Sequence, residues 1–141
     1  MKLLKFLLAT VFISILFVGC LSKTTSIYDV DIKKGKGTII VYRPHNSIWK
    51  NKRFNIYIND EYEDMLMNRS HHVFYKNPGK YEIELREDIE LEPESYKVEV
   101  QLNEGKVKYI KLGTNSIEDH LKLKSVRKAV AIGDEWSKKR Y

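Results

Sequence analysis

The chain has 141 residues, 31% of them charged and 43% apolar, which suits one globular domain with short appendages rather than two domains or a disordered chain. Its formal net charge of +6 is uneven, because residues 1–19 carry +2, residues 20–60 carry +5, residues 61–120 carry −6 and residues 121–141 carry +5. Basic ends suit an anionic membrane surface, whereas a nucleic-acid-binding protein usually gathers cations and aromatic residues on one face, so we expect no nucleic-acid partner.

The first twenty residues, MKLLKFLLATVFISILFVGC, have the order of an export signal. Lys2 and Lys5 give a positive start, residues 6–18 form a thirteen-residue apolar run, and Gly19 precedes Cys20. A helix needs about 20 apolar residues to cross a bilayer, so this run is short for a permanent span and has the length of a signal-peptide apolar region. The alternatives are an uncleaved anchor helix and a signal peptide cut at another position.

Cys20 is the only cysteine, which excludes an intramolecular disulfide and a zinc site built from several cysteines. The stretch LFVGC, residues 16–20, resembles the lipobox of bacterial lipoproteins, except that Phe17 stands where leucine is commonest. The resemblance implies that diacylglycerol is joined to the Cys20 sulfur. It also implies that a signal peptide of residues 1–19 is cut off between Gly19 and Cys20, and that the new N-terminus receives an N-acyl lipid. Two or more acyl chains hold a protein firmly on a membrane.

The same resemblance implies a location in the bacterial cell envelope, anchored to a membrane by lipid. In enteric bacteria an aspartate after the lipidated cysteine retains a lipoprotein in the inner membrane. Leu21 occupies that position here, so the outer membrane is favoured if the organism has two membranes.

Residues 20–36 are polar, carry several lysines and show no sustained periodicity, and they predict a tether. Within them, IYDVDI at residues 27–32 also suits a short edge strand. The sixteen residues after Cys20, 21–36, extend to at most about 55 Å, at roughly 3.3–3.6 Å each, so we expect the folded domain to stand off the membrane.

Residues 37–126 predict a domain of short strands separated by turns. Alternation places Phe54, Ile56 and Ile58 on one face of their strand, and the segments at 81–86 and 96–102 alternate in the same way. Asn59 to Glu61, NPGK at 77–80 and NEGK at 103–106 predict turns, the last as a hairpin. The expected strands cover residues 38–43, 54–60, 62–67, 71–76, 81–86, 96–102, 107–113 and 120–126.

No helix-length segments alternate with these strands, which favours a mainly β fold, a small antiparallel β-sandwich of the immunoglobulin-like or PEGA-like kind. The basic C-terminal segment, residues 127–141, has apolar residues at roughly helical spacing. It predicts a short terminal helix, although Gly133 weakens it.

A second resemblance covers residues 37–125. VYRP at 41–44, IYIND at 56–60, NPGKYEIE at 77–84 and KYIKLG at 108–113 are similar to a family of small bacterial lipoprotein domains of unknown function. The resemblance implies a β-sandwich with a layout related to PEGA-type surface domains, and it supplies no catalytic residues. The acidic segment after residue 59 departs from the usual aspartate-glycine turn of the family.

The histidines and carboxylates of the chain are candidate metal ligands. His71 and His72 are adjacent on a predicted strand and point to opposite faces, so a shared metal would need His45 or His120 to approach one of them. The acidic run at residues 86–94 has no glycine turn for a calcium loop and suits a solvated loop or edge. We therefore expect no metal site, and no cofactor beyond the lipid on Cys20.

Arg43, just before Pro44, is the one candidate interaction residue. Its guanidinium suits a clamp on a carboxylate or phosphate, a cap at the strand end, or a pair with an acid of the middle region. The chain has no nucleophile elbow, phosphate loop or HExxH motif.

These patterns predict a lipid-anchored envelope protein that is not an enzyme. Its sandwich would bind another envelope protein, peptidoglycan or a surface polymer, in the periplasm or at the cell surface. The alternatives are a periplasmic metal carrier that uses the histidines and an envelope enzyme that uses two carboxylates facing each other in a pocket. The sequence does not predict the oligomeric state.

Overall fold

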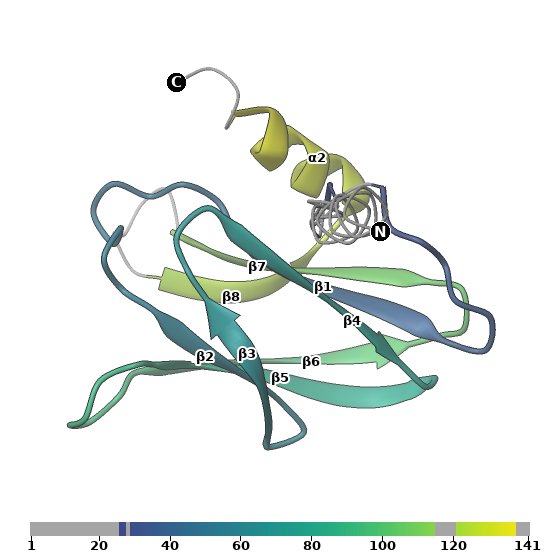
Figure 1. The fold of residues 1–141 in the computed structure, drawn as a ribbon, viewed down its shortest axis with the longest axis horizontal. Helices are drawn as coiled ribbons and strands as arrows, with labels where there is room; N and C mark the ends of the chain where they lie inside the picture. The colour runs from purple at the N-terminus through teal and green to yellow at the C-terminus, as the bar shows by residue number, and fades with distance from the viewer. Residues whose placement is uncertain (1–25, 28, 115–120, 138–141) are drawn as a thin grey trace, which may run out of the picture.

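The computed structural model describes residues 26–27, 29–114 and 121–137, with side chains described as far as residue 134. The predicted lipid-attachment residue Cys20 and the cleavage position at Gly19 lie outside the described residues. The described part forms eight strands and one helix (Figure 1). They are β1 (Gly37–Arg43), β2 (Phe54–Ile58), β3 (Glu61–Leu66), β4 (Ser70–Lys76), β5 (Gly79–Glu87), β6 (Ser95–Leu102), β7 (Val107–Thr114), β8 (Leu121–Val126) and α2 (Lys128–Ser137).

The strands form two four-stranded sheets that pack face to face. Sheet A has the order β4-β1-β7-β8, and sheet B has the order β3-β2-β5-β6. Among the described strands, neighbours run antiparallel except for β1 and β7, which pair in parallel with Thr38 opposite Val107. The predicted mainly β fold, a small antiparallel β-sandwich, and the predicted C-terminal helix are confirmed, with this parallel pair as a departure.

The core between the sheets is built by the predicted alternation. In β2, Phe54, Ile56 and Ile58 are at most 2% exposed, while the residues between them are half-buried. Burying one such side chain stabilises the fold by about 1.5–3 kcal/mol, so this core is the main source of stability. Its buried members are Ile39, Val41, Phe54, Ile56, Ile58, Leu66, Ile83, Leu85, Val100, Leu102, Ile110, Leu112, Leu121 and Leu123.

Two predicted turns join the sheets rather than neighbouring strands. NEGK, residues 103–106, forms a turn that Lys106 N closes by donating to Asn103 O at 3.1 Å. The predicted hairpin is wrong, because the chain passes here from β6 in sheet B to β7 in sheet A. In sheet A both faces of β7 are covered, so Tyr109 and Ile110 are both buried. A hairpin would place β7 beside β6 at the edge of sheet B, where one face of the strand would stay exposed. NPGK likewise leads from β4 to β5 in the other sheet, and Gly79 already belongs to β5.

Strand β1 is buried along its whole length because both of its faces are covered. Ile39 and Val41 face sheet B, whereas Ile40 and Tyr42 face the opposite side. Figure 1 shows α2 lying over sheet A, on the side away from β5 and β6. A second core therefore forms between sheet A and α2, and its buried members are Ile27, Ile40, Tyr42, Tyr109 and Ala131.

Ile27 lies in the segment predicted to be a tether, yet it is 2% exposed and belongs to this second core. The described residues of 27–32 form no strand, so the edge strand expected there is not found in them. Six residues, 21–26, therefore separate Cys20 from a side chain that is packed on the domain.

A polar contact fastens α2 to sheet A beside the second core. Tyr42 donates its hydroxyl to Asp134 Oδ2 at 2.7 Å, and Lys111 Nζ donates to Asp134 Oδ1 at 2.9 Å. Burial, together with the hydrogen bond to Asp134, raises the pKa of Tyr42 well above its ordinary value. The C-terminal segment is thus joined to the sandwich by apolar packing and by an ion pair.

Candidate functional site

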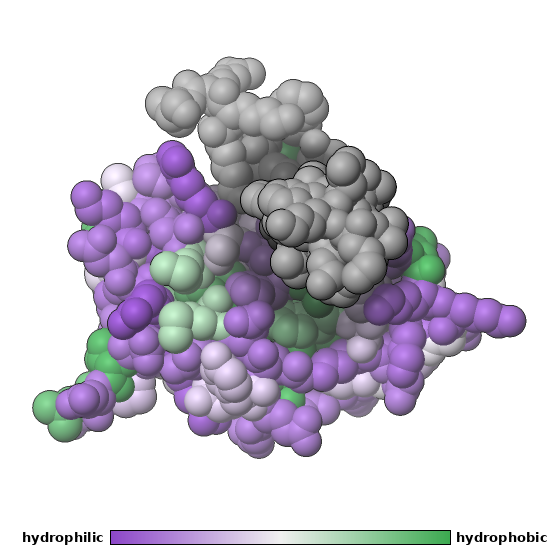
Figure 2. Space-filling model, viewed as in Figure 1, coloured by the Kyte–Doolittle hydropathy of each residue, from purple (hydrophilic) through white to green (hydrophobic). Residues whose placement is uncertain are grey.

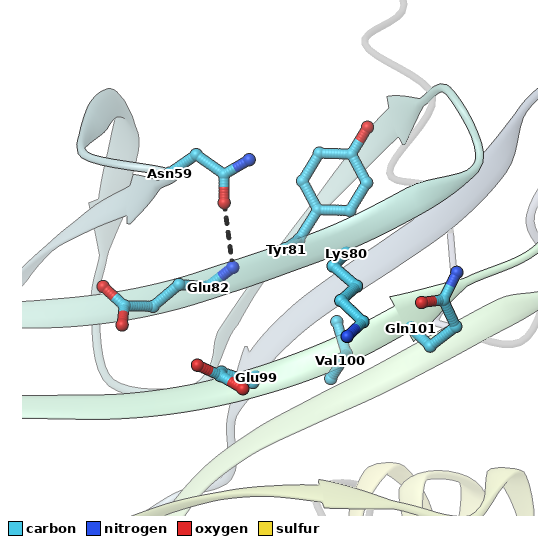
Figure 3. Close-up of a pocket in the computed structure, with 7 residues that line it drawn as sticks. All are labelled: Asn59, Lys80, Tyr81, Glu82, Glu99, Val100 and Gln101. Carbon is cyan, nitrogen blue, oxygen red and sulfur yellow. Dashed lines mark hydrogen bonds between the residues drawn. The ribbon is translucent and has the colours of Figure 1, made fainter.

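The outer face of sheet B carries an open depression of about 490 Å³ (Figure 3). Figure 3 shows side chains from the β2–β3 turn and from two neighbouring strands around it, with the carboxylates of Glu82 and Glu99 toward one end and Gln101 toward the other. We call this the sheet B depression, and its lining residues are Asn59, Lys80, Tyr81, Glu82, Glu99, Val100 and Gln101.

The register of β5 and β6 places most of these residues together. Glu82 lies opposite Glu99, and Lys80 lies opposite Gln101, on antiparallel strands. Successive residues of a strand point to opposite faces, so the residues that alternate with the core residues of β5 and β6 share the solvent side. The ring of Tyr81 packs against the core between the sheets, and its hydroxyl donates to Asn77 O at 2.7 Å.

Asn59 closes one side of the depression from the tight turn between β2 and β3. Asn59 and Asp60 have φ values of 51° and 65°, and two positive φ values are typical of a type I′ hairpin turn, which favours asparagine and aspartate. Asn59 N donates to Glu82 O, and Glu82 N donates to Asn59 Oδ1, each at 2.9 Å. The predicted turn is confirmed, and these two bonds fix it against β5.

An ion network continues from the depression along the outer face of sheet B. Lys97 Nζ lies 2.8 Å from Glu82 Oε1 and 3.5 Å from Glu84 Oε2. Arg86 Nη2 lies 2.7 Å from Glu84 Oε2 and 3.3 Å from Asp60 Oδ1. Like charges directly opposite each other destabilise a sheet, and Lys97 offsets this repulsion between Glu82 and Glu99.

Glu84 is the most strongly held acid of the network, and its side chain is 6% exposed. The hydrogen bond from Arg86 is the main cause that lowers the pKa of Glu84 to about 2, and a hydrogen bond from Ser95 and the charge of Lys97 add to it. Glu84 therefore stays ionised far into the acid range, and its role is to hold cations on this face.

Asp60, Glu82 and Glu84 form the group of possible metal ligands within the described residues, with oxygens that lie within 4.8 Å of one another. Arg86 and Lys97 already hold these oxygens at ion-pair distance. A cation would have to displace both side chains, so the donor set suits a structural ion network better than a metal centre.

Arg43, the predicted interaction residue, is 1% exposed. Its Nη1 donates to Lys52 O at 2.6 Å, its Nη2 donates to Trp49 O, and its guanidinium lies 5.3 Å from the centre of the Phe54 ring. The structure describes no acid paired with Arg43. Burial lowers the pKa of Arg43 from its ordinary value. Arg43 therefore fixes the loop at residues 44–53 over the end of β1.

The structure describes three of the four histidines, and His120 lies outside the described residues. His72 Nδ1 lies 2.8 Å from Asp64 Oδ2, and the His72 ring stacks on Phe74. His45 lies beside Asn68, with the two nitrogens 3.3 Å apart. Among the described residues, no group of three or more metal-ligating side chains contains a histidine.

The acidic run forms the loop between β5 and β6. Ile89 and Leu91 are 50% and 83% exposed, and Figure 2 shows hydrophobic colour at the far end of this projecting loop. Glu87 at its base is instead buried and lies 2.8 Å from Lys52 Nζ. The loop has no calcium-type ligand arrangement among its described residues.

The sequence alone does not single out the residues of the sheet B depression. Alternation in β5 and β6 does predict that Lys80, Glu82, Glu99 and Gln101 lie on the solvent side of their strands. Whether these side chains lie next to one another depends on the register between β5 and β6. The connection of seven residues between these strands does not fix that register. The approach of Asn59 depends on the order of the strands in the sheet.

Fold and surface together define a small two-sheet sandwich whose outer face carries a polar depression and an ion network. A family model described as "Protein of unknown function (DUF2846)" matches residues 33–123, and the chain belongs to this family. The match runs from before β1 into β8. A comparison with curated proteins gave no match. None of the helices in the described part of the chain has the length and hydropathy to cross a membrane.

Proposed function

We propose that the protein is a lipid-anchored component of a bacterial envelope and that its sheet B depression binds a hydroxyl- and amide-rich envelope polymer such as peptidoglycan. The lipid on Cys20 holds the protein on the membrane, and the sandwich acts by binding rather than by catalysis. The anchor is supported by the sequence LFVGC, in which the lone cysteine follows an apolar run of signal-peptide length.

The observation that carries the binding proposal is the mixture of polar groups in the depression. Lys80 offers ammonium donors, Glu82 and Glu99 offer carboxylate acceptors, and the Gln101 amide offers both. Alternating donors and acceptors around a concave surface suit a neutral or zwitterionic polymer better than a strongly charged one.

Binding is tested by pelleting the purified protein with isolated peptidoglycan. Glu99 and Glu90 are both exposed, so Glu99→Ala and Glu90→Ala remove the same charge inside and outside the depression. We expect Glu99→Ala to weaken binding roughly tenfold, because a hydrogen bond to a charged group is lost, and Glu90→Ala to bind as wild type. Equal binding by the two variants would refute a role for the depression.

The anchor is tested by growing cells with radiolabelled palmitate. We expect label in the wild-type protein and none in Cys20→Ala, because the thioether and the new N-terminus both depend on Cys20. Labelling of both proteins would place the lipid elsewhere, and labelling of neither would refute the anchor.

A second function, a carboxylate-based hydrolase, is favoured by one observation. Glu82 and Glu99 lie directly opposite each other beside a concave surface, as an acid and a base require. Soluble fragments released from peptidoglycan by the wild type, and not by Glu99→Gln, would support this function. Binding without fragment release would favour the binding module.

A further inference from the structure

The two sheets differ in charge. The strands of sheet A carry six cations and no acid, whereas the strands of sheet B carry three cations and seven acids. Lys122 and Lys124 alternate with the core residues of β8 and are exposed on the outer side of sheet A. Arg43 is buried, and Lys76 and Lys111 pair with acids, so the basic side of the folded domain rests on Lys108, Lys122 and Lys124 of these strands. Sheet B forms the acidic side.

Four cations line a second depression, of about 550 Å³, at one end of sheet A. We call it the basic depression. Its lining contains no acidic side chain among the described residues. The lining residues are Gly105, Lys106, Val107, Lys108, Tyr109, Ser125, Val126, Arg127 and Lys128. An electropositive concavity with an apolar floor suits a phosphate group that is attached to an apolar molecule.

The N-terminal segment is packed beside this depression. Ile27 belongs to the same apolar cluster as Val107, Tyr109 and Val126, which line the depression. The six residues between Cys20 and Ile27 allow these two residues to be at most about 25 Å apart, at roughly 3.3–3.6 Å per residue. The side of sheet A that carries Ile27 is therefore held near any lipid attached to Cys20, which is a shorter reach than the sequence alone predicts.

We infer that the basic depression binds the phosphate groups of anionic lipids in the membrane that holds the anchor. The inference rests on the proposed lipid anchor. The short link allows the domain to rotate above the membrane, and the attraction between the cations and the anionic surface selects the orientation with sheet A toward the lipid. Packed sheets lie about 10 Å apart, so sheet B and its depression then face away from the membrane, toward a polymer.

The test uses the mature lipidated protein in vesicles of phosphatidylglycerol and phosphatidylcholine that contain nitroxide-labelled headgroups. The lipid occupies the Cys20 sulfur, so an introduced cysteine is the one thiol available for a fluorescent label. Ser125→Cys places the label at the basic depression, and Gln101→Cys places it at the sheet B depression; both positions are exposed. We expect several-fold stronger quenching at residue 125.

Charge-reversal variants show whether the cations set the orientation. We expect Lys106→Glu with Lys128→Glu to abolish the difference in quenching between the two labels. The control Lys50→Glu with Arg53→Glu makes the same change in charge at exposed positions outside both depressions and should keep the difference. Vesicles of phosphatidylcholine alone should also abolish it.

Equal quenching at the two positions in anionic vesicles, with the protein still bound, would overturn the inference. So would a difference that persists in phosphatidylcholine, because tether length rather than charge would then set the orientation. Shielding of residue 125 that occurs only in native envelope vesicles would assign the depression to a protein partner and also overturn it. A protein that does not float with vesicles would contradict the lipid anchor itself, and flotation separates that failure from the others.

Discussion

Arg43 shows how one buried side chain holds an irregular loop. Its guanidinium binds the carbonyls of Trp49 and Lys52, so Arg43→Ala leaves two acceptors without their donors and opens space beside Phe54. We expect the free energy of unfolding in urea to fall by about 3 kcal/mol. Arg53→Ala, at an arginine that is 55% exposed, should change it by less than about 0.5 kcal/mol. Equal effects would show that Arg43 does not hold the loop.

The lowered pKa of Glu84 predicts that the protein loses stability in acid. Its pKa is about 2 in the folded protein and lies near 4.3 in an unfolded chain, so the unfolded state binds the proton more readily. The stabilisation is complete above about pH 4.3 and is lost as the pH falls toward 2. Unfolding in urea should show Glu84→Gln less stable than wild type by about 2 kcal/mol at pH 6 and nearly equal to it at pH 2. A constant difference across this range would contradict the ion network.

Alternation identifies the buried residues, whereas their polar partners depend on contacts distant in the sequence. The inward faces of β2, β5 and β6 follow directly from apolar residues at every second position. The carbonyl partners of Arg43 could not be predicted in the same way, because the loop at residues 44–53 has no periodicity that fixes its path. The sequence therefore does not predict that Arg43 is buried.

At the scale of elements, substitution by alanine should change stability in opposite directions at two glycines. A Cβ at Gly37, the first residue of β1, would lie 2.4 Å from Leu102 Cγ and 2.7 Å from Asn103 O. We expect Gly37→Ala to destabilise the protein by about 1–3 kcal/mol through overpacking. A Cβ at Gly133 in α2 meets nothing within 4 Å, so Gly133→Ala should stabilise by about 0.5–1 kcal/mol through helix propensity. Thermal unfolding followed by circular dichroism measures both, and changes of the same sign would contradict this packing.

Strands and turns could be located from local patterns, whereas their partners could not. β-Branched and aromatic residues locate the strands, and asparagine, glycine and proline locate the turns between them. A turn can join two neighbouring strands of one sheet or pass from one sheet to the other. Which of these occurs depends on where the next strand can bury both of its faces. β7 pairs with β1, over sixty residues earlier in the chain, so the expectation of a β6–β7 hairpin is wrong.

At the scale of the whole molecule, the uneven charge of the sequence becomes a difference between two sides. The acidic middle of the chain supplies most of sheet B and its loop, and the basic ends supply β8 and the segments around Ile27 and α2. The position of Ile27 in the second core could not be predicted, since the apolar residues at 27–32 suit an edge strand and do not show which face of a sheet they would cover. This contact shortens the link between the domain and Cys20.

The proposed anchor and orientation both require a modified Cys20 at the N-terminus of the mature protein. The intact mass of the protein isolated from membranes tests this requirement most directly. We predict a chain that begins at Cys20, lacks residues 1–19 and is heavier than its sequence by a diacylglycerol and an N-acyl group. A mature protein that begins at another residue, or that begins at Cys20 without added lipid, would contradict the proposal.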